Sequence, residues 1–130
     1  MKKIIIMSVL VLLMSIPAWA FSGEVVGTVQ GFTCLTTGKI CPVDKEDPLV
    51  AATRVFVVKT SGTEYYFVPN LDRALLARYL NKKVKVVGQI NSRYRSINAE
   101  AFQVWRDGKW KTIWTKELEE ETMKEFEVGT

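Results

Sequence analysis

Histidine is absent from this chain of 130 residues, and cysteine occurs only twice. The absence of histidine removes the commonest general base, the Ser-His and Cys-His nucleophile pairs, and most zinc and haem ligand sets. No pair of carboxylates and no isolated lysine stands in an arrangement that would replace it. We therefore predict a protein that is not an enzyme and that uses no metal and no cofactor.

A long hydrophobic run is also missing. The apolar segment Ile4–Ile16 is shorter than the roughly 20 residues that a membrane-spanning helix needs. Two lysines precede it, and Pro17 followed by Ala18-Trp19-Ala20 supplies a small-residue cleavage site. Residues 1–20 are therefore interpreted as a secretory signal peptide, with the mature chain periplasmic or secreted and without a transmembrane segment. An uncleaved N-terminal anchor is the alternative.

The remaining charge is unevenly distributed. The whole chain holds 18 Lys and Arg against 14 Asp and Glu, and removal of Lys2 and Lys3 leaves 16 against 14. Residues 116–130 hold two lysines and six glutamates, so residues 21–115 hold 14 positive and 8 negative charges, a net of +6. Such a body favours an anionic partner, whereas the alternative is a solvated surface with an acidic helix against it.

Hydrophobic periodicity and turn residues predict one mainly β domain at 21–115 and an acidic C-terminal helix or tail at 116–130. The predicted strands are Glu24–Phe32, Arg54–Thr60, Thr63–Val68, Lys83–Ile90, Ile97–Arg106 and Lys109–Trp114. The predicted helices are a segment capped by Asn70 and ended by Asn81, and Lys116–Glu127. Residues 33–52 are predicted to be mostly loop, a phase shift near Phe102 predicts a bulge, and Asp107-Gly108 predicts a hairpin turn.

A single helix between the third and fourth of five strands is typical of the OB-fold. We predict a small OB-fold-like barrel of five to six strands with a further helix at its C-terminus. Another small β roll or sandwich with an added helix is the alternative.

Three stretches carry a resemblance to a known group of proteins. They are Tyr65–Leu71, Leu80–Gly88 and Ile97–Glu100, and the chain resembles small exported bacterial OB-fold proteins without characterised activity over about Val25–Trp114. The resemblance implies a periplasmic binding or stress-related module and carries no catalytic residues.

Cys34 and Cys41 are separated by six residues, within which Thr37-Gly38 can form a reversing turn. In an oxidising compartment, two cysteines predict a disulfide. A redox pair usually has two intervening residues, and two thiolates without histidine do not complete a zinc shell, although Asp44 or Asp47 could contribute. We therefore predict a structural disulfide, with the redox pair and the metal site as alternatives.

OB barrels bind ligands across their second and third strands, between the loops that follow the first and fourth strands. In this chain that arrangement predicts a ligand-binding edge made of Lys39, Tyr66, Arg93, Tyr94 and Arg95. Arginines beside a tyrosine suit an anionic or sugar-like ligand. A solvated basic turn is the alternative, and the aromatic residues Tyr65, Tyr66, Trp105, Trp110 and Trp114 are either a stacking platform or core.

Together these features predict an exported, monomeric or weakly associating, non-enzymatic OB-fold binding module of the bacterial envelope. Its partner is an unidentified small or anionic ligand or an envelope protein, and export argues against intracellular nucleic acid. Two alternatives remain open. One is a binder of polyanions, nucleic acid or oligosaccharides, and the other is a structural subunit that docks through its acidic helix.

Overall fold

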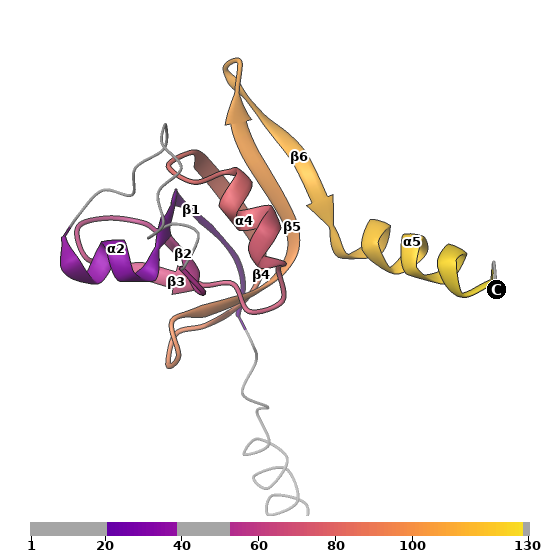
Figure 1. Ribbon diagram of the computed structural model, residues 1–130, viewed down its shortest axis with the longest axis horizontal. Coiled ribbons are helices and arrows are strands. Elements are labelled where there is room, and N and C mark those ends of the chain that lie inside the picture. The colour runs from indigo at the N-terminus through magenta and orange to yellow at the C-terminus, as the bar shows by residue number, and fades with distance from the viewer. Residues whose placement is uncertain (1–20, 39–52, 129–130) are drawn as a thin grey trace, which may run out of the picture.

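The computed structural model describes residues 21–38 and 53–128 as one sheet with three helices (Figure 1). The strands are β1 (Phe21–Gly31), β2 (Phe56–Lys59), β3 (Tyr65–Phe67), β4 (Lys83–Asn91), β5 (Ser96–Arg106) and β6 (Lys109–Thr115). The helices are α2 (Phe32–Thr37), α4 (Arg73–Arg78) and α5 (Lys116–Val128). The predicted leader, residues 1–20, lies outside the described residues, as do Lys39 and Cys41.

The strands follow the order β3-β2-β1-β4-β5-β6, and neighbours in this order are antiparallel. One further pairing joins β3 to β5 in parallel, between Phe67 and Ser96. The backbone amide of Phe67 donates to the carbonyl of Arg95 there, at 2.8 Å. The predicted mainly β class is confirmed, with six strands in one sheet, a short helix between β3 and β4, and a helix at the C-terminal end.

The core lies on one face of the sheet. It is formed by apolar residues that alternate along each strand with polar residues of the opposite face. Val29 of β1, Val58 of β2, Val84 and Val86 of β4 and Phe102 of β5 are all fully buried. Residues 71–80, which we name the α4 segment, close this core with the predicted apolar face. Leu71, Leu76 and Leu80 are buried, and Leu75 and Tyr79 pack beside them. Burial of this kind is the main stabilising contribution to a domain of this size.

The start of α4 differs from the prediction. Asp72 caps the helix, since its Oδ1 accepts a hydrogen bond from the backbone amide of Ala74 at 2.6 Å. The side chain of Asn70 instead bonds to both backbone groups of Ala99, donating to its carbonyl at 2.8 Å and accepting from its amide at 2.7 Å. The predicted Asn70 cap is therefore wrong, because a long-range partner on β5 satisfies the amide that a local cap would have used.

Two local predictions in the second half of the sheet are confirmed. The register between β4 and β5 shifts at Val87/Gly88, and that between β5 and β6 shifts at Phe102/Gln103. Burial along β5 accordingly changes phase, from Ile97 and Ala99 to Phe102 and Val104. Asp107 and Gly108 both have positive φ, 53° and 74°, as a two-residue type I′ hairpin turn requires.

Helix α2 was not predicted, since residues 33–52 were expected to be mostly loop. Its N-terminus has no side-chain cap, so local signals for a helix are weak. Tertiary contacts stabilise it: Cys34 is buried, and the ring of Phe32 lies 5.6 Å from that of Tyr65 and 5.5 Å from that of Phe67. Short helices depend on such packing more than on propensity.

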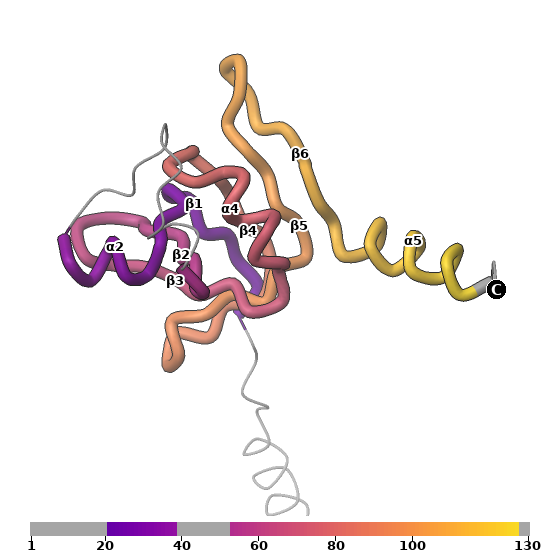
Figure 2. The backbone as a smooth tube through the Cα atoms, in the orientation of Figure 1, coloured from indigo at the N-terminus to yellow at the C-terminus, as the bar shows by residue number. Residues whose placement is uncertain are grey.

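Helix α5 was predicted and is present. It extends away from the rest of the chain in both views (Figures 1 and 2). The predicted apolar edge Leu118, Thr122 and Phe126 is exposed, and Phe126 is 73% accessible. Apart from contacts near its start with β5 and β6, the acidic helix therefore does not pack against the described part of the basic body. Among the described residues, no helix is both long and apolar enough to cross a bilayer.

Candidate ligand-binding cleft

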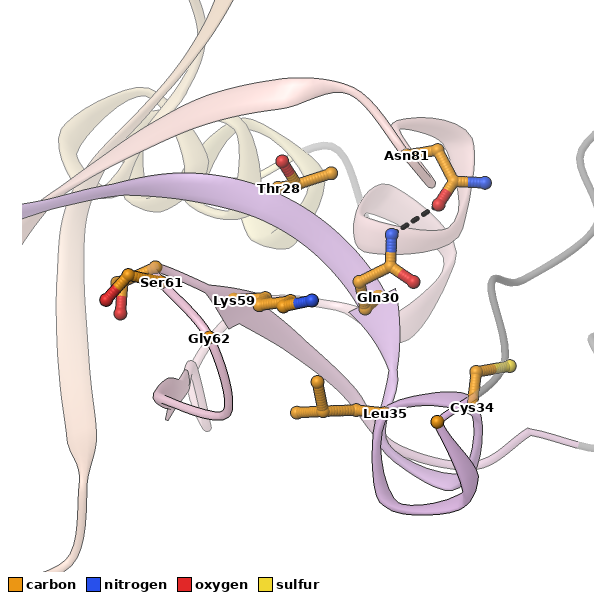
Figure 3. Close-up of a pocket in the computed structure, with 10 residues that line it drawn as sticks. Thr28, Gln30, Cys34, Leu35, Lys59, Ser61, Gly62 and Asn81 are labelled. Atoms are coloured by element: carbon orange, nitrogen blue, oxygen red, sulfur yellow. Dashed lines mark hydrogen bonds between the residues drawn. The ribbon is translucent and has the colours of Figure 1, made fainter.

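A polar cleft of about 690 Å³ lies on the face of β1 and β2 that is turned away from the core (Figure 3). Its walls come from β1, from α2, from the turn between β2 and β3, and from the residue that follows the α4 segment. The lining residues are Thr28, Gln30, Cys34, Leu35, Gly38, Lys59, Thr60, Ser61, Gly62 and Asn81. Lys59 is the only one of them that carries a charge at neutral pH.

Strand alternation explains why polar side chains reach this cleft. Val29 and Val58 point into the core, so their neighbours Thr28 and Lys59 point to the opposite face. The register pairs Thr28 with Lys59 across β1 and β2, and Lys59 with Tyr65 across β2 and β3. Directly opposite residues share a face of the sheet, so these three side chains form one row.

Hydrogen bonds hold one wall of the cleft in shape. The side-chain amide of Gln30 donates to Oδ1 of Asn81 (Figure 3). Asn81 has a φ of 60°, a left-handed conformation that asparagine tolerates better than most residues. Its backbone amide donates to the carbonyl of Val29 at 2.8 Å, which ties the end of the α4 segment to β1. These bonds fix the position of Asn81 against β1.

The predicted basic turn, residues 91–95, lies beside β3. Oδ1 of Asn91 accepts hydrogen bonds from the amides of Arg93 and Tyr94 at 3.1 and 3.3 Å, which orders the turn. The guanidinium of Arg95 lies 5.7 Å from the ring centre of Tyr65, and that of Arg93 lies 5.6 Å from the ring of Tyr94. Neither arginine forms an ion pair with any described residue. Their charges are therefore available to a ligand.

The structure places the remaining predicted site residues differently. Tyr66 packs against the core, because it alternates with Tyr65 and Phe67, which contact Phe32 on the outer face. Tyr65, not Tyr66, is thus the tyrosine beside Arg95. Lys39 and Cys41 fall outside the described residues, although Gly38, next to Lys39, lines the cleft. Cys34 is 1% exposed.

A second aromatic and basic group lies on the outer face of β4, β5 and β6. The rings of Trp105 and Trp110 meet edge to face at 5.1 Å, and Lys83 Nζ lies 5.2 Å from the ring centre of Trp105. Lys85 Nζ lies 4.6 Å from the ring of Trp110 and 3.9 Å from a carboxylate oxygen of Glu24. Trp105 is 43% exposed, whereas Trp114 packs against the core.

Sequence reasoning missed Lys59, Lys83 and Lys85 as candidate binding residues. The signal that could have found them is the period of two along their own strands, β2 and β4, since each lysine alternates with buried valines. The sequence did not show which strands are neighbours, and that information is needed to group the three lysines.

No metal site is evident in residues 21–38 and 53–128, where no three acidic or cysteine side chains cluster. Comparison of the chain with known protein families, with curated proteins and with solved structures finds no match. The residues of the cleft are therefore the basis for any functional conclusion.

Proposed function

We propose that this protein is an exported, non-enzymatic binding module that takes an anionic ligand in the polar cleft beside β2. One observation carries the proposal: Lys59 is a half-buried cation in the cleft, and no carboxylate is among the described residues that line it. A cation in such a cleft can form a charge-assisted hydrogen bond with an anionic ligand. The described residues of the lining include no histidine, aspartate or glutamate, the groups that act most often in acid–base catalysis.

The order of strand pairing supports an OB-type barrel as the scaffold. Strand β3 pairs with both β2 and β5, so the pairings of β1 to β5 form a closed ring. Helix α4 lies between β3 and β4 in the chain, as the OB-fold has it. In that fold, ligands bind over strands two and three beside the loops that follow strands one and four. Lys59 at the end of β2, α2 in the β1–β2 connection and Arg95 in the β4–β5 turn occupy the corresponding places.

Export and a disulfide between Cys34 and Cys41 belong to the same proposal. Residues 1–20 have the charge, apolar length and small residues of a signal peptide, and Cys34 is held buried in α2. Closing so short a loop would stabilise the fold by about 2.5 kcal/mol in the chain-entropy model.

The compartment and the disulfide can be tested by one mass measurement. When the full chain is expressed in a bacterial host, the mature protein is expected to begin at Phe21 and to lack two hydrogens relative to its reduced mass. The sample should be recovered from the periplasm or the medium and measured intact, before and after reduction. A product that retains Met1 and gains no hydrogen on reduction would contradict both export and the disulfide.

Replacing Lys59 with glutamine should weaken binding of an acidic sugar about tenfold, because it removes one charge-assisted hydrogen bond worth roughly 1.5 kcal/mol. The probe is tri-galacturonate, titrated into the purified protein and followed by calorimetry. The matched control is Lys111→Gln, since Lys111 pairs with the core residue Val104 and so lies on the opposite face of the sheet. Equal affinities of the two variants, or no binding to the wild type, would refute the proposed function.

A further inference from the structure

We infer that the cleft is one end of a longer binding track for a linear acidic polysaccharide, an inference that rests on the proposed function. The sheet register continues the row of Lys59 beyond the cleft, because Thr28 pairs with Lys59 on one side and with Lys83 of β4 on the other. Lys83 in turn lies over Trp105, which pairs with Trp110. We name as the basic row the residues Tyr65, Lys59, Thr28, Lys83, Trp105 and Trp110.

The basic row crosses all six strands on one face. Neighbouring strands are about 4.8 Å apart, so a row of six covers roughly 24 Å measured along the curved surface of the sheet, far more than a single anion needs. Arg95 adds a cation above Tyr65 at one end, and Lys85 adds another beside Trp110 at the other end. The row contains no acidic residue, and the carboxylate of Glu24 lies 3.9 Å from Lys85 Nζ beside it. A ligand that satisfies such a row must carry several negative charges along its length.

The aromatic rings help to decide between polysaccharide and nucleic acid. Proteins that bind single-stranded nucleic acids without sequence preference stack the bases on open aromatic faces. Here Tyr65 already has Arg95 over its ring, Trp105 has Lys83, and Trp110 has both Lys83 and Lys85. The rings therefore hold cations close to their faces and reduce the freedom of those cations. A base that stacked on the same face would displace the cation, whereas the carboxylates of a chain of acidic sugars can contact the cation in place, so this arrangement favours acidic sugars.

The experiment compares ligands of different length on the wild-type protein. A hexamer can occupy a trimer site in several registers, which alone tightens its binding roughly fourfold. Beyond this gain, hexa-galacturonate is expected to bind about tenfold more tightly than tri-galacturonate, because it makes two added surface charge contacts. The log–log salt dependence should steepen by about two, one for each added lysine contact. Tryptophan emission should change with the hexamer and not with the trimer, because only the hexamer reaches Trp105 and Trp110.

Variants separate the two ends of the basic row. The double substitution Lys83→Gln with Lys85→Gln should abolish the additional tenfold gain for the hexamer, whereas Lys59→Gln should weaken the binding of both oligomers. Lys111→Gln, on the opposite face, should change neither. The length comparison on the wild type needs no variant, so it remains decisive even if the double variant does not fold.

Each failure has a distinct signature. No binding of tri-galacturonate would refute the proposed function itself. If the trimer binds through Lys59 and the hexamer shows no gain beyond the register effect, the cleft remains a binding site and the longer binding track is refuted. Tighter binding of hexathymidylate than of hexa-galacturonate would assign the row to single-stranded nucleic acid. Equal binding of neutral maltohexaose would overturn the electrostatic argument.

Discussion

Replacing Gly27 with alanine is expected to destabilise the protein by about 3 kcal/mol, at the upper end of typical overpacking effects. A Cβ at this position would lie 2.1 Å from the carbonyl oxygen of Lys59 and 2.8 Å from its carbonyl carbon. Both atoms belong to the backbone of β2, so neither can rotate away, and the two strands would have to separate. The melting temperature followed by circular dichroism should fall by roughly 10–20 °C for a domain of this size.

The same substitution should also weaken the binding of tri-galacturonate, because Lys59 is the residue that the new methyl group displaces. Gly23→Ala in the same strand is the matched control. There the nearest atoms are side-chain carbons of Ile90 and Phe21, at 2.9 and 3.0 Å, which can move. If both alanine variants melted at the wild-type temperature, the close approach of β1 and β2 at Gly27 would be wrong.

Truncation of Phe102 to alanine should cost about 3–5 kcal/mol, the usual range for a fully buried aromatic residue. Phe102 has no accessible surface and is the largest of the fully buried side chains. The centre of its ring lies 5.7 Å from the centre of the Tyr79 ring. Its loss would leave a cavity between the sheet and the α4 segment, which neighbouring side chains can fill only in part. Denaturant unfolding monitored by circular dichroism measures the change.

Phe126→Ala makes the identical chemical change at an exposed position. Phe126 is 73% accessible on α5, so its replacement should alter the free energy of unfolding by less than about 0.5 kcal/mol. A similar loss at both positions would mean that α5 packs against the domain in solution, which would contradict the exposed position of this helix.

Local patterns predicted much of the fold. Six strands, the α4 segment and α5 were placed within a few residues, because alternation with a period of two and helical spacing are visible over short windows. The hairpin at Asp107-Gly108 and the phase change in β5 were also confirmed. In each case the residues that decide the structure are near neighbours in the chain.

The errors occurred where distant contacts decide the structure. Helix α2 forms because Phe32 meets Tyr65 and Phe67 and because Cys34 is buried, none of which a local window contains. Asn70 looked like a helix cap, but its amide bonds to Ala99 on β5. The candidate site was located only in part for the same reason: the basic turn was found from its composition, whereas Lys59 was not.

The sequence by itself determined the six strands, the α4 segment and α5, the absence of histidine, and the distribution of charge between body and tail. Only the tertiary structure decided that Lys59 lies between Thr28 and Tyr65 and that Lys83 continues the same row. The physical reason is strand register: a shift of one residue reverses the face of every side chain. Register is set by pairing between segments far apart in the chain and by burial of one face.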